Sequence, residues 1–180
     1  MKFAAIILAA ITGVALIIFC SIMSSKNGAI GLEEEVNTAI SAIDSHLTTR
    51  FNKLHELAAC VKKYDKHESE TLVKVIEARG KNMSGAQAKE CIAAFSRVEE
   101  RYPDLKSQAN YKFLMNDIAL TENHLNQTRK GMNESIRDYR YYCRKFPTSF
   151  ILSVTGYCVK KFDMYQAEDS HRDTKPLELF

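Results

Sequence analysis

The 180-residue chain contains no tryptophan, only three prolines and only seven glycines. Few prolines and glycines leave long stretches without a helix breaker, while the good helix formers alanine, leucine, glutamate and lysine are frequent. With 25 Lys and Arg against 22 Asp and Glu, the chain lacks the basic excess that is typical of nucleic-acid-binding domains. The composition therefore predicts an all-α protein without a nucleic-acid partner.

Enzyme and metal signatures are also missing. No H-E-x-x-H or G-x-S-x-G motif occurs. Only His171 has a glutamate three residues before it, whereas a di-iron helix bundle needs two such pairs. The cysteines show no C-x-x-C spacing, which argues against a zinc site. We expect no enzymatic activity, no metal, no cofactor and no small-molecule substrate. Three cysteines are interpreted as small buried side chains: Cys60, Cys91 and Cys143.

One long apolar run is present, from Phe3 to Met23, and it contains no charged residue. As a helix it extends about 31 Å, which is the thickness of the hydrocarbon core of a bilayer. The alternative is a secretory signal peptide, whose apolar part usually has about 7–15 residues and ends in a small-x-small cleavage site. Because this run is longer and lacks such a site, we predict a retained transmembrane helix over residues 1–26. Lys2 and Lys26 balance each other, so the positive-inside rule leaves the side of the membrane undecided.

Beyond this run the hydrophobic residues follow the pattern of amphipathic helices. Two glycines predict a short hinge over residues 27–31. Through residues 32–147 apolar side chains recur three and four positions apart, which predicts a bundle of amphipathic helices. Gly80 indicates a helix stop, and the Ser84-x-x-Gln87 pair indicates a capping box at the next helix start. Whether the first part is one long helix or a hairpin broken near His55 stays open.

The last long helix has the most regular pattern in the chain. Its seam residues alternate at spacings of three and four, and Pro147 ends the helix. Small hydroxyl residues within the seam can donate hydrogen bonds to carbonyls one turn back. Residues 148–180 are predicted to form an irregular tail packed on the bundle. The predicted seam is Tyr111, Leu114, Ile118, Thr121, Leu125, Thr128, Met132, Ser135, Tyr139, Tyr142 and Phe146.

Several motifs resemble those of the LemA family. Tyr-Pro-Asp-Leu-Lys at residues 102–106 precedes Thr-Glu-Asn at residues 121–123, and Lys-His-Glu at residues 66–68 and Phe-Pro at residues 146–147 also match. The chain lacks the tryptophan that the family usually has shortly before Ile43, which implies a repacked core. The resemblance covers the whole chain. It implies a transmembrane helix followed by a four-helix bundle, a bacterial inner-membrane location and a structural role without established enzymatic activity.

Two groups of side chains are candidate functional surfaces. Polar residues in or near the family motifs are interpreted either as a network that sets helix register or as a partner-binding surface. They are His67, Glu68, Arg79, Thr121, Glu122, Asn123, Arg129 and Asn133. The second group, the basic collar, is placed to attract anionic lipid headgroups if four antiparallel helices bring the last helix back toward the membrane. It consists of Arg137, Arg140, Tyr141, Arg144, Lys145, Lys160 and Lys161.

These features together predict a non-enzymatic, membrane-anchored helical scaffold or adapter. Its expected partners are membrane lipid, through the N-terminal helix, and other proteins or further copies of itself. The alternative is a lipid- or amphiphile-binding helical module, for which a cavity among the seam hydroxyls would be the sign. Its expected location is the bacterial inner membrane, crossed once.

Overall fold

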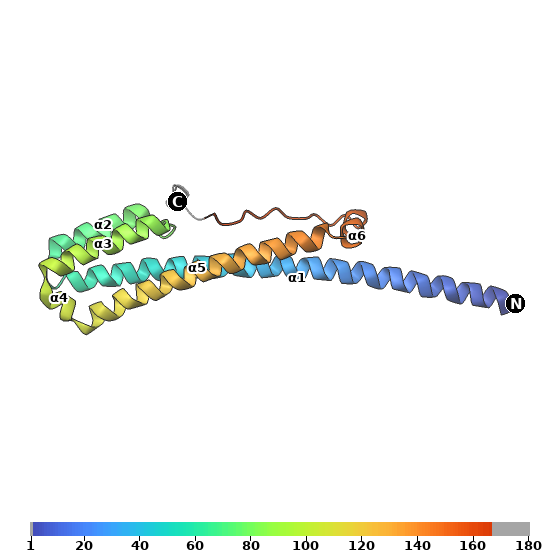
Figure 1. Cartoon of the computed structure of the whole chain (residues 1–180), viewed down its shortest axis with the longest axis horizontal. Coiled ribbons are helices and arrows are strands. Elements are labelled where there is room, and N and C mark those ends of the chain that lie inside the picture. The colour runs from blue at the N-terminus through green and yellow to red at the C-terminus, as the bar shows by residue number, and fades with distance from the viewer. Residues whose placement is uncertain (1, 167–180) are drawn as a thin grey trace, which may run out of the picture. The chain divides into compact units, whose positions relative to one another are not determined.

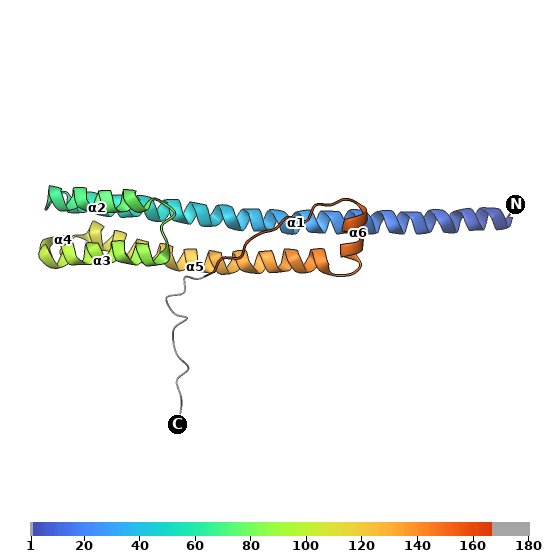
Figure 2. The ribbon, with the colours of Figure 1, turned by 90° about the horizontal axis from the view of Figure 1, so that it is seen from above.

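The computed structural model describes residues 2–166, and all regular structure within them is helical (Figures 1 and 2). The all-α prediction is therefore confirmed for this part of the chain, with a long apolar first helix followed by several packed helices. The helices are α1 (Lys2–Val61), α2 (Lys66–Arg79), α3 (Gly85–Arg101), α4 (Pro103–Ser107), α5 (Ala109–Arg144) and α6 (Thr148–Val154).

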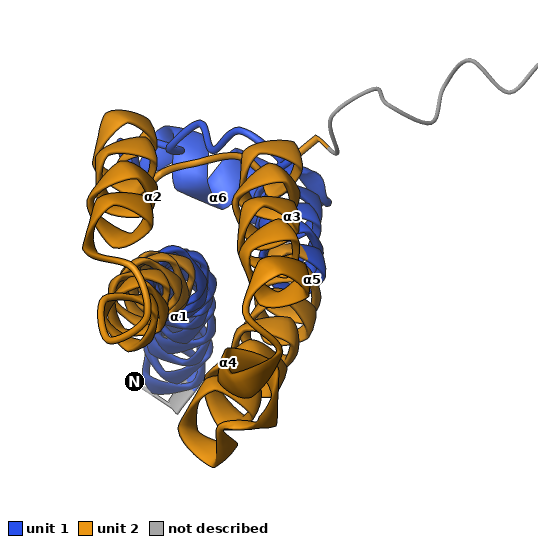
Figure 3. Cartoon of the chain, turned by 90° about the vertical axis from the view of Figure 1, so that its left-hand side faces the viewer, with its two compact units in different colours: residues 1–40, 130–165 blue, residues 41–129, 166–180 orange. Residues whose placement is uncertain are grey.

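The chain divides into two compact units, which Figure 3 shows in different colours. Unit 1 comprises residues 1–40 and 130–165, and unit 2 comprises residues 41–129 and 166–180. The long helices α1 and α5 each contribute one part to unit 1 and the other part to unit 2.

Unit 2 is an antiparallel bundle of four helical segments, namely the end of α1, then α2, α3 and the start of α5. In this unit α2 lies along α1 and α3 lies along α5 (Figures 2 and 3). The Ser69 hydroxyl on α2 donates to the Ala58 carbonyl on α1 at 2.8 Å. The Tyr111 hydroxyl on α5 donates to the Phe95 carbonyl on α3 at 3.2 Å. The predicted four-helix arrangement is thus present in this unit.

The turns of unit 2 follow from local capping chemistry. The first helix breaks after Val61 rather than near His55, and the Asp65 carboxylate caps α2 by accepting the Glu68 N–H at 3.0 Å. Gly80 ends α2 with φ of 65° and ψ of −178°, a backbone conformation that is open almost only to glycine. The predicted capping box at the start of α3 is confirmed, because both of its reciprocal hydrogen bonds are made.

The hydrophobic core of unit 2 is drawn from all four segments. Phe95, Ile76, Leu54 and Ile118 are each almost completely buried. Burial raises the pKa of the Tyr111 hydroxyl, so this group stays protonated and keeps its donor role toward α3. The expectation of buried thiols is confirmed at Cys60, Cys91 and Cys143.

The buried face of α5 departs from the predicted seam in its second half. A strict heptad repeat falls behind a straight α-helix by about 20° per seven residues, and five heptads therefore accumulate about 100°, which is one residue. The buried positions accordingly move from 128, 135 and 142 to Arg129, Ile136 and Cys143. Phe146, predicted to close the seam, is instead 84% exposed.

Unit 1 contains the apolar part of α1, and α1 continues through residues 27–31 without a break. The predicted hinge is therefore not a break in the helix. A Cβ atom at Gly28 would overlap the Tyr142 hydroxyl oxygen on α5, whereas a Cβ atom at Gly31 would meet open space. Gly28 thus serves close packing of α5 against α1 rather than chain flexibility.

We expect opposite effects of alanine at these two glycines. Gly31→Ala should raise the free energy of unfolding by about 0.5–1 kcal/mol, because glycine in a helix loses more backbone entropy on folding. Gly28→Ala should lower it by about 1 kcal/mol or more, because Tyr142 must move away from its site. Thermal unfolding of the detergent-solubilised chain measures both. Equal stabilisation by the two substitutions would contradict the close contact.

The segment after α5 in unit 1 is more ordered than the irregular tail that the sequence predicts. Residues 148–154 form α6, although their β-branched and aromatic side chains favour strands. From residue 155 to residue 166 the chain has no helix or strand. The remainder of the predicted tail, residues 167–180, lies outside the described residues.

Candidate functional site

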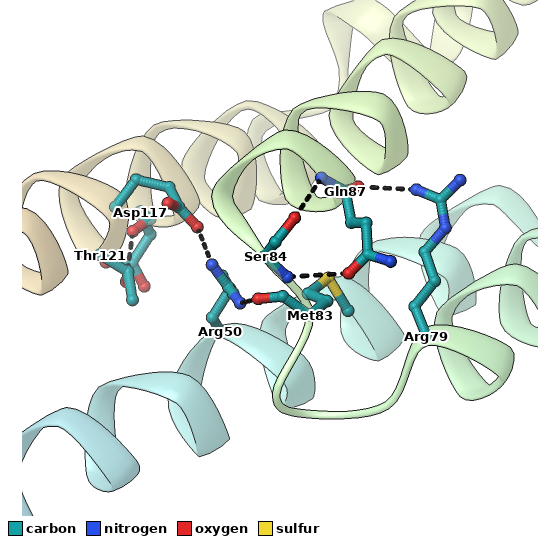
Figure 4. A network of polar contacts seen from close by, with 8 residues as sticks. Arg50, Arg79, Met83, Ser84, Gln87, Asp117 and Thr121 are labelled. Atoms are coloured by element: carbon teal, nitrogen blue, oxygen red, sulfur yellow. Dashed lines mark hydrogen bonds and ion pairs between the residues drawn. The ribbon is translucent and has the colours of Figure 1, made fainter. Parts of the chain in front are cut away.

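The most prominent polar feature of unit 2 is Arg50 on α1, whose side chain is 0% exposed. Its Nη1 donates to the Glu122 carboxylate on α5 at 2.8 Å. Its Nη2 donates to the Met83 carbonyl between α2 and α3 (Figure 4). Arg50 therefore links α1 to α5 and to the α2–α3 loop. A buried charge requires such partners, because its desolvation is otherwise costly.

A second cation lies one turn further along α1. The Lys53 ammonium group is 2.7 Å from the Asp117 carboxylate and donates to the Thr121 hydroxyl at 3.0 Å. Thr121 in turn donates to the Asp117 carbonyl at 2.8 Å, which is the bond to the preceding turn that the sequence predicts for a seam hydroxyl. Figure 4 shows Asp117 and Thr121 beside Arg50.

Together these contacts form the α1–α5 polar pairs, which we define as Arg50–Glu122 and Lys53–Asp117. Each pair joins a cation on α1 to a carboxylate on α5, and the two pairs are one helical turn apart. Sliding one helix past the other would separate both pairs and leave Arg50 buried without a carboxylate. The arrangement is therefore suited to setting helix register. Among residues 2–166, no group of three or more His, Cys, Asp or Glu is placed to hold a metal ion.

The other predicted motif residues do not join this cluster. Arg79 donates to the Gln87 carbonyl at 2.7 Å and to Glu90 at 2.8 Å, which ties α2 to α3. Glu68 pairs with Arg101 at the opposite end of the same two helices. The remaining positions are distributed over the surface and interior: His67 and Asn123 are exposed, Arg129 is buried on α5, and Asn133 lies in unit 1.

Arg50, Lys53 and Asp117 are functional candidates that the predicted site residues did not include. The signal for Arg50 was present in the sequence, because it stands four positions before Leu54 and seven before Leu57 on the apolar face of α1. A cation at such a position must be paired. No comparable sequence signal identifies Lys53 or Asp117, because which surface carboxylate a lysine reaches depends on helix packing.

The basic collar lies in unit 1, where its residues occupy two different levels along α1. The Tyr142 hydroxyl donates to the Ser24 carbonyl at 3.5 Å, so the end of α5 is beside the end of the apolar run. At this level Arg144 and Lys145 are exposed, and the Lys145 ammonium group lies 4.4 Å from the centroid of the Tyr142 ring. The tail lysine Lys160 lies nine residues further along α1, at Glu33.

The collar residues also differ in how far their charges are neutralised. Lys160 lies 2.6 Å from the Glu33 carboxylate, and Arg137 lies 3.0 Å from Asp138. Arg140 donates to the Phe162 carbonyl, a neutral acceptor that does not neutralise the charge of the guanidinium. The exposed members of the collar are Arg137, Tyr141, Arg144, Lys145, Lys160 and Lys161.

Residues 157–165 are attached to α1 and α5 by a set of contacts that we call the tail clasp. The Tyr157 hydroxyl donates to Glu33 at 2.5 Å, and the Lys160 N–H donates to the Tyr139 hydroxyl at 3.0 Å. Asn133 exchanges two hydrogen bonds with the Tyr165 backbone, at 2.9 and 2.8 Å. Glu33 is the centre of the clasp because both Tyr157 and Lys160 reach its carboxylate.

The clasp should weaken in acid. Hydrogen bonding from Lys160, then from Tyr157, lowers the pKa of Glu33 below its ordinary value of 4.5. A depressed folded-state pKa means that the stabilisation is present above pH 4.5 and is lost as the pH falls through the lower, folded value. We expect the Lys160 amide to lose hydrogen-exchange protection, corrected for intrinsic rate, at acidic pH.

Two substitutions provide the controls for this pH dependence. Glu33→Gln should remove it, whereas Glu34→Gln, at the exposed neighbouring position, should leave it intact. Equal protection of Lys160 in the unmodified chain on both sides of the transition would contradict the role of Glu33.

The family of the chain follows from a comparison with known sequences. The sequence model of the LemA family matches residues 39–178, which is more than three quarters of the chain. This span contains both α1–α5 polar pairs and the whole basic collar, while the apolar run precedes it. No curated protein matches the chain. On the strength of the family match, the chain belongs to the LemA family.

Proposed function

We propose that this protein is a membrane-anchored helical scaffold or adapter without enzymatic activity, which associates with itself or holds partner proteins at the bacterial inner membrane. The observation that carries the proposal is the apolar run of α1. It is long and apolar enough to cross a membrane, and its most apolar 18-residue window buries none of its residues against the described chain. The core helix of a water-soluble protein would bury such side chains, so lipid is the environment that suits this segment.

The interior of unit 2 supports a structural role. The completely buried charge of Arg50 is paired with the Glu122 carboxylate. The seam hydroxyls are also engaged, because Thr121 and Thr128 donate to carbonyls one turn back at 2.8 and 2.9 Å. These bonds do not favour the alternative of an amphiphile cavity lined by seam hydroxyls.

Unit 2 also presents apolar side chains to its surroundings. Phe113 and Leu120 on α5 are both more than half exposed, and their separation of seven residues places them on one face of the helix. An exposed aromatic and an exposed leucine on one face are suited to contact with another protein.

Crosslinking in cells tests the scaffold proposal. A photoreactive residue at Phe113 in the full chain should give crosslinks to a second copy or to a partner protein, identified by mass spectrometry. The matched control carries the same residue at Arg97, which is exposed on α3. If position 113 gives no more adducts than position 97, the proposed contact surface is wrong.

A further inference from the structure

The short helix α6 lies against the apolar run of α1 within unit 1. A hollow of about 380 Å³ between the two helices is lined on one side by Ile18 and Ile22 and on the other by Phe150 and Val154. A neighbouring hollow joins Pro147 and Ile151 to the same stretch of α1, residues 16–25. Helix α6 therefore stands at the level of the last residues of the apolar run.

The side chains of α6 divide between an inward and an outward face. Leu152 and Thr148 are buried. Phe150 and Val154 are 64% and 70% exposed, and Phe146, just before the helix, is the most exposed of the three. A helix of seven residues that presents its large apolar side chains outward is unfavourable in water, because the transfer of apolar surface from water to an apolar environment is favourable.

Charge is distributed around this helix in a pattern that matches a membrane surface. Residues 146–159 contain no charged side chain, and they are preceded by Arg144-Lys145 and followed by Lys160-Lys161. Of these four cations, Lys160 is paired with Glu33. Arg144 and Lys145 are exposed, and neither makes an ion pair with another described residue.

These observations leave one suitable occupant for the outward face. A protein partner would need to bind at the level of Ile18 and Ile22, where the apolar run is itself suited to lipid. The lipid acyl chains that surround the apolar run would also cover Phe150 and Val154, so no additional partner is needed. The exposed cations next to them suit the anionic headgroups of the same leaflet.

We propose that α6, together with Phe146, is an interfacial helix that inserts its apolar face into the boundary between headgroups and acyl chains. It enters the leaflet that holds the last residues of the apolar run, and Arg144 and Lys145 bind anionic lipid headgroups beside it. This inference rests on the membrane anchoring proposed above and adds a second lipid contact to it. Interfacial helices bury their apolar face by about 5–10 Å, so shallow acyl-chain positions should be close to Phe150.

The absence of tryptophan allows a direct test with single-tryptophan variants of the full chain. Phe150→Trp reports on α6, Phe19→Trp reports on the apolar run, and Phe113→Trp is an exposed control in unit 2. Each variant is reconstituted into vesicles of phosphatidylcholine with added phosphatidylglycerol, in which the phosphatidylcholine carries bromine at a shallow or a deep acyl position. Bromine quenches tryptophan fluorescence only at close range.

Shallow bromine should quench the Phe150→Trp variant by roughly twofold or more, and more strongly than deep bromine, because of the shallow insertion of interfacial helices. The Phe19→Trp variant should also be quenched, and the Phe113→Trp variant should not. Quenching at position 19 without quenching at position 150 would overturn the interfacial helix and leave the anchor intact. Lack of quenching at both positions would overturn the anchor itself.

The charge component is tested in the Phe150→Trp background. Arg144→Gln with Lys145→Gln should reduce the quenching in vesicles that contain phosphatidylglycerol and should have little effect in pure phosphatidylcholine. The same reduction in both kinds of vesicle would overturn the assignment of these residues to anionic headgroups. Far-ultraviolet circular dichroism of each variant verifies that its helices are retained.

Discussion

Replacing Arg50 by methionine should be among the most destabilising single changes in unit 2. The substitution removes the buried guanidinium and leaves the Glu122 carboxylate and the Met83 carbonyl without their donor. Breaking a buried pair by removing one partner costs about 3–5 kcal/mol. The Glu122 carboxylate is 20% exposed and water can reach it, so the lower limit of about 3 kcal/mol applies. The melting temperature should fall by roughly 6–12 °C.

Three further variants separate a structural network from an incidental contact. Arg101→Met removes the exposed pair with Glu68 and should cost less than about 1 kcal/mol. Glu122→Gln keeps a hydrogen-bond acceptor but removes the charge, so an intermediate loss is expected. Adding Glu122→Leu to Arg50→Met should recover part of the stability, because an apolar pair replaces the orphaned carboxylate. Unchanged melting of Glu122→Gln, or equal losses for Arg50→Met and Arg101→Met, would favour a partner-binding surface instead.

Two arginines in the middle of the apolar run should release the protein from the membrane. Ile11 and Val14 lie near the centre of the run. Exchanging an isoleucine or valine for arginine at the centre of a spanning helix changes the insertion free energy by about 3 kcal/mol. The double variant, Ile11→Arg with Val14→Arg, therefore loses about 6 kcal/mol. The fraction of chain that resists alkaline carbonate extraction should fall sharply.

The matched control places the same charges outside the run. Phe113→Arg with Leu120→Arg replaces apolar side chains of similar exposure on α5 and should leave membrane retention unchanged. If the two double variants are retained in the membrane to the same extent, lipid is not the environment of residues 11 and 14.

The sequence was sufficient to predict features that depend on local chemistry. The capping box at Ser84 and the helix stop at Gly80 involve residues only a few positions apart, so the pattern contains all the interacting groups. The apolar run is likewise defined by composition and length alone. The family motifs extended this prediction to the four-helix arrangement of unit 2.

Features that depend on packing over a distance were predicted less well. The prediction extended the α5 seam with a strict heptad spacing, which drifts away from the buried face of a straight helix. As a result it placed the exposed Phe146 in the seam and left out the buried Ile136. The two glycines at residues 28 and 31 indicated a flexible hinge. Residue 28 instead needs to be glycine because Tyr142, more than a hundred residues away in the sequence, packs against it.

The helix α6 was missed for a related reason. Its intrinsic preference is for strand, and tertiary contact with α1 overrides that preference. For the candidate site, Glu122 and Thr121 were identified from the family motif. The position of Arg50 on the apolar face of α1 already indicated a cation that needs a partner, whereas its pairing with Glu122 and the contact of Lys53 with Thr121 depend on how α1 and α5 pack.

The intact mass of the mature protein in its native membrane tests the central claim most directly. Membranes are washed with alkaline carbonate, extracted with detergent, and the protein is analysed by mass spectrometry. We expect a chain close to 20.4 kDa that retains residues 3–23 and is recovered only with detergent. A shorter chain that begins after residue 23 and is recovered in the aqueous fraction would show that the apolar run is a cleaved signal, and would contradict both lipid proposals.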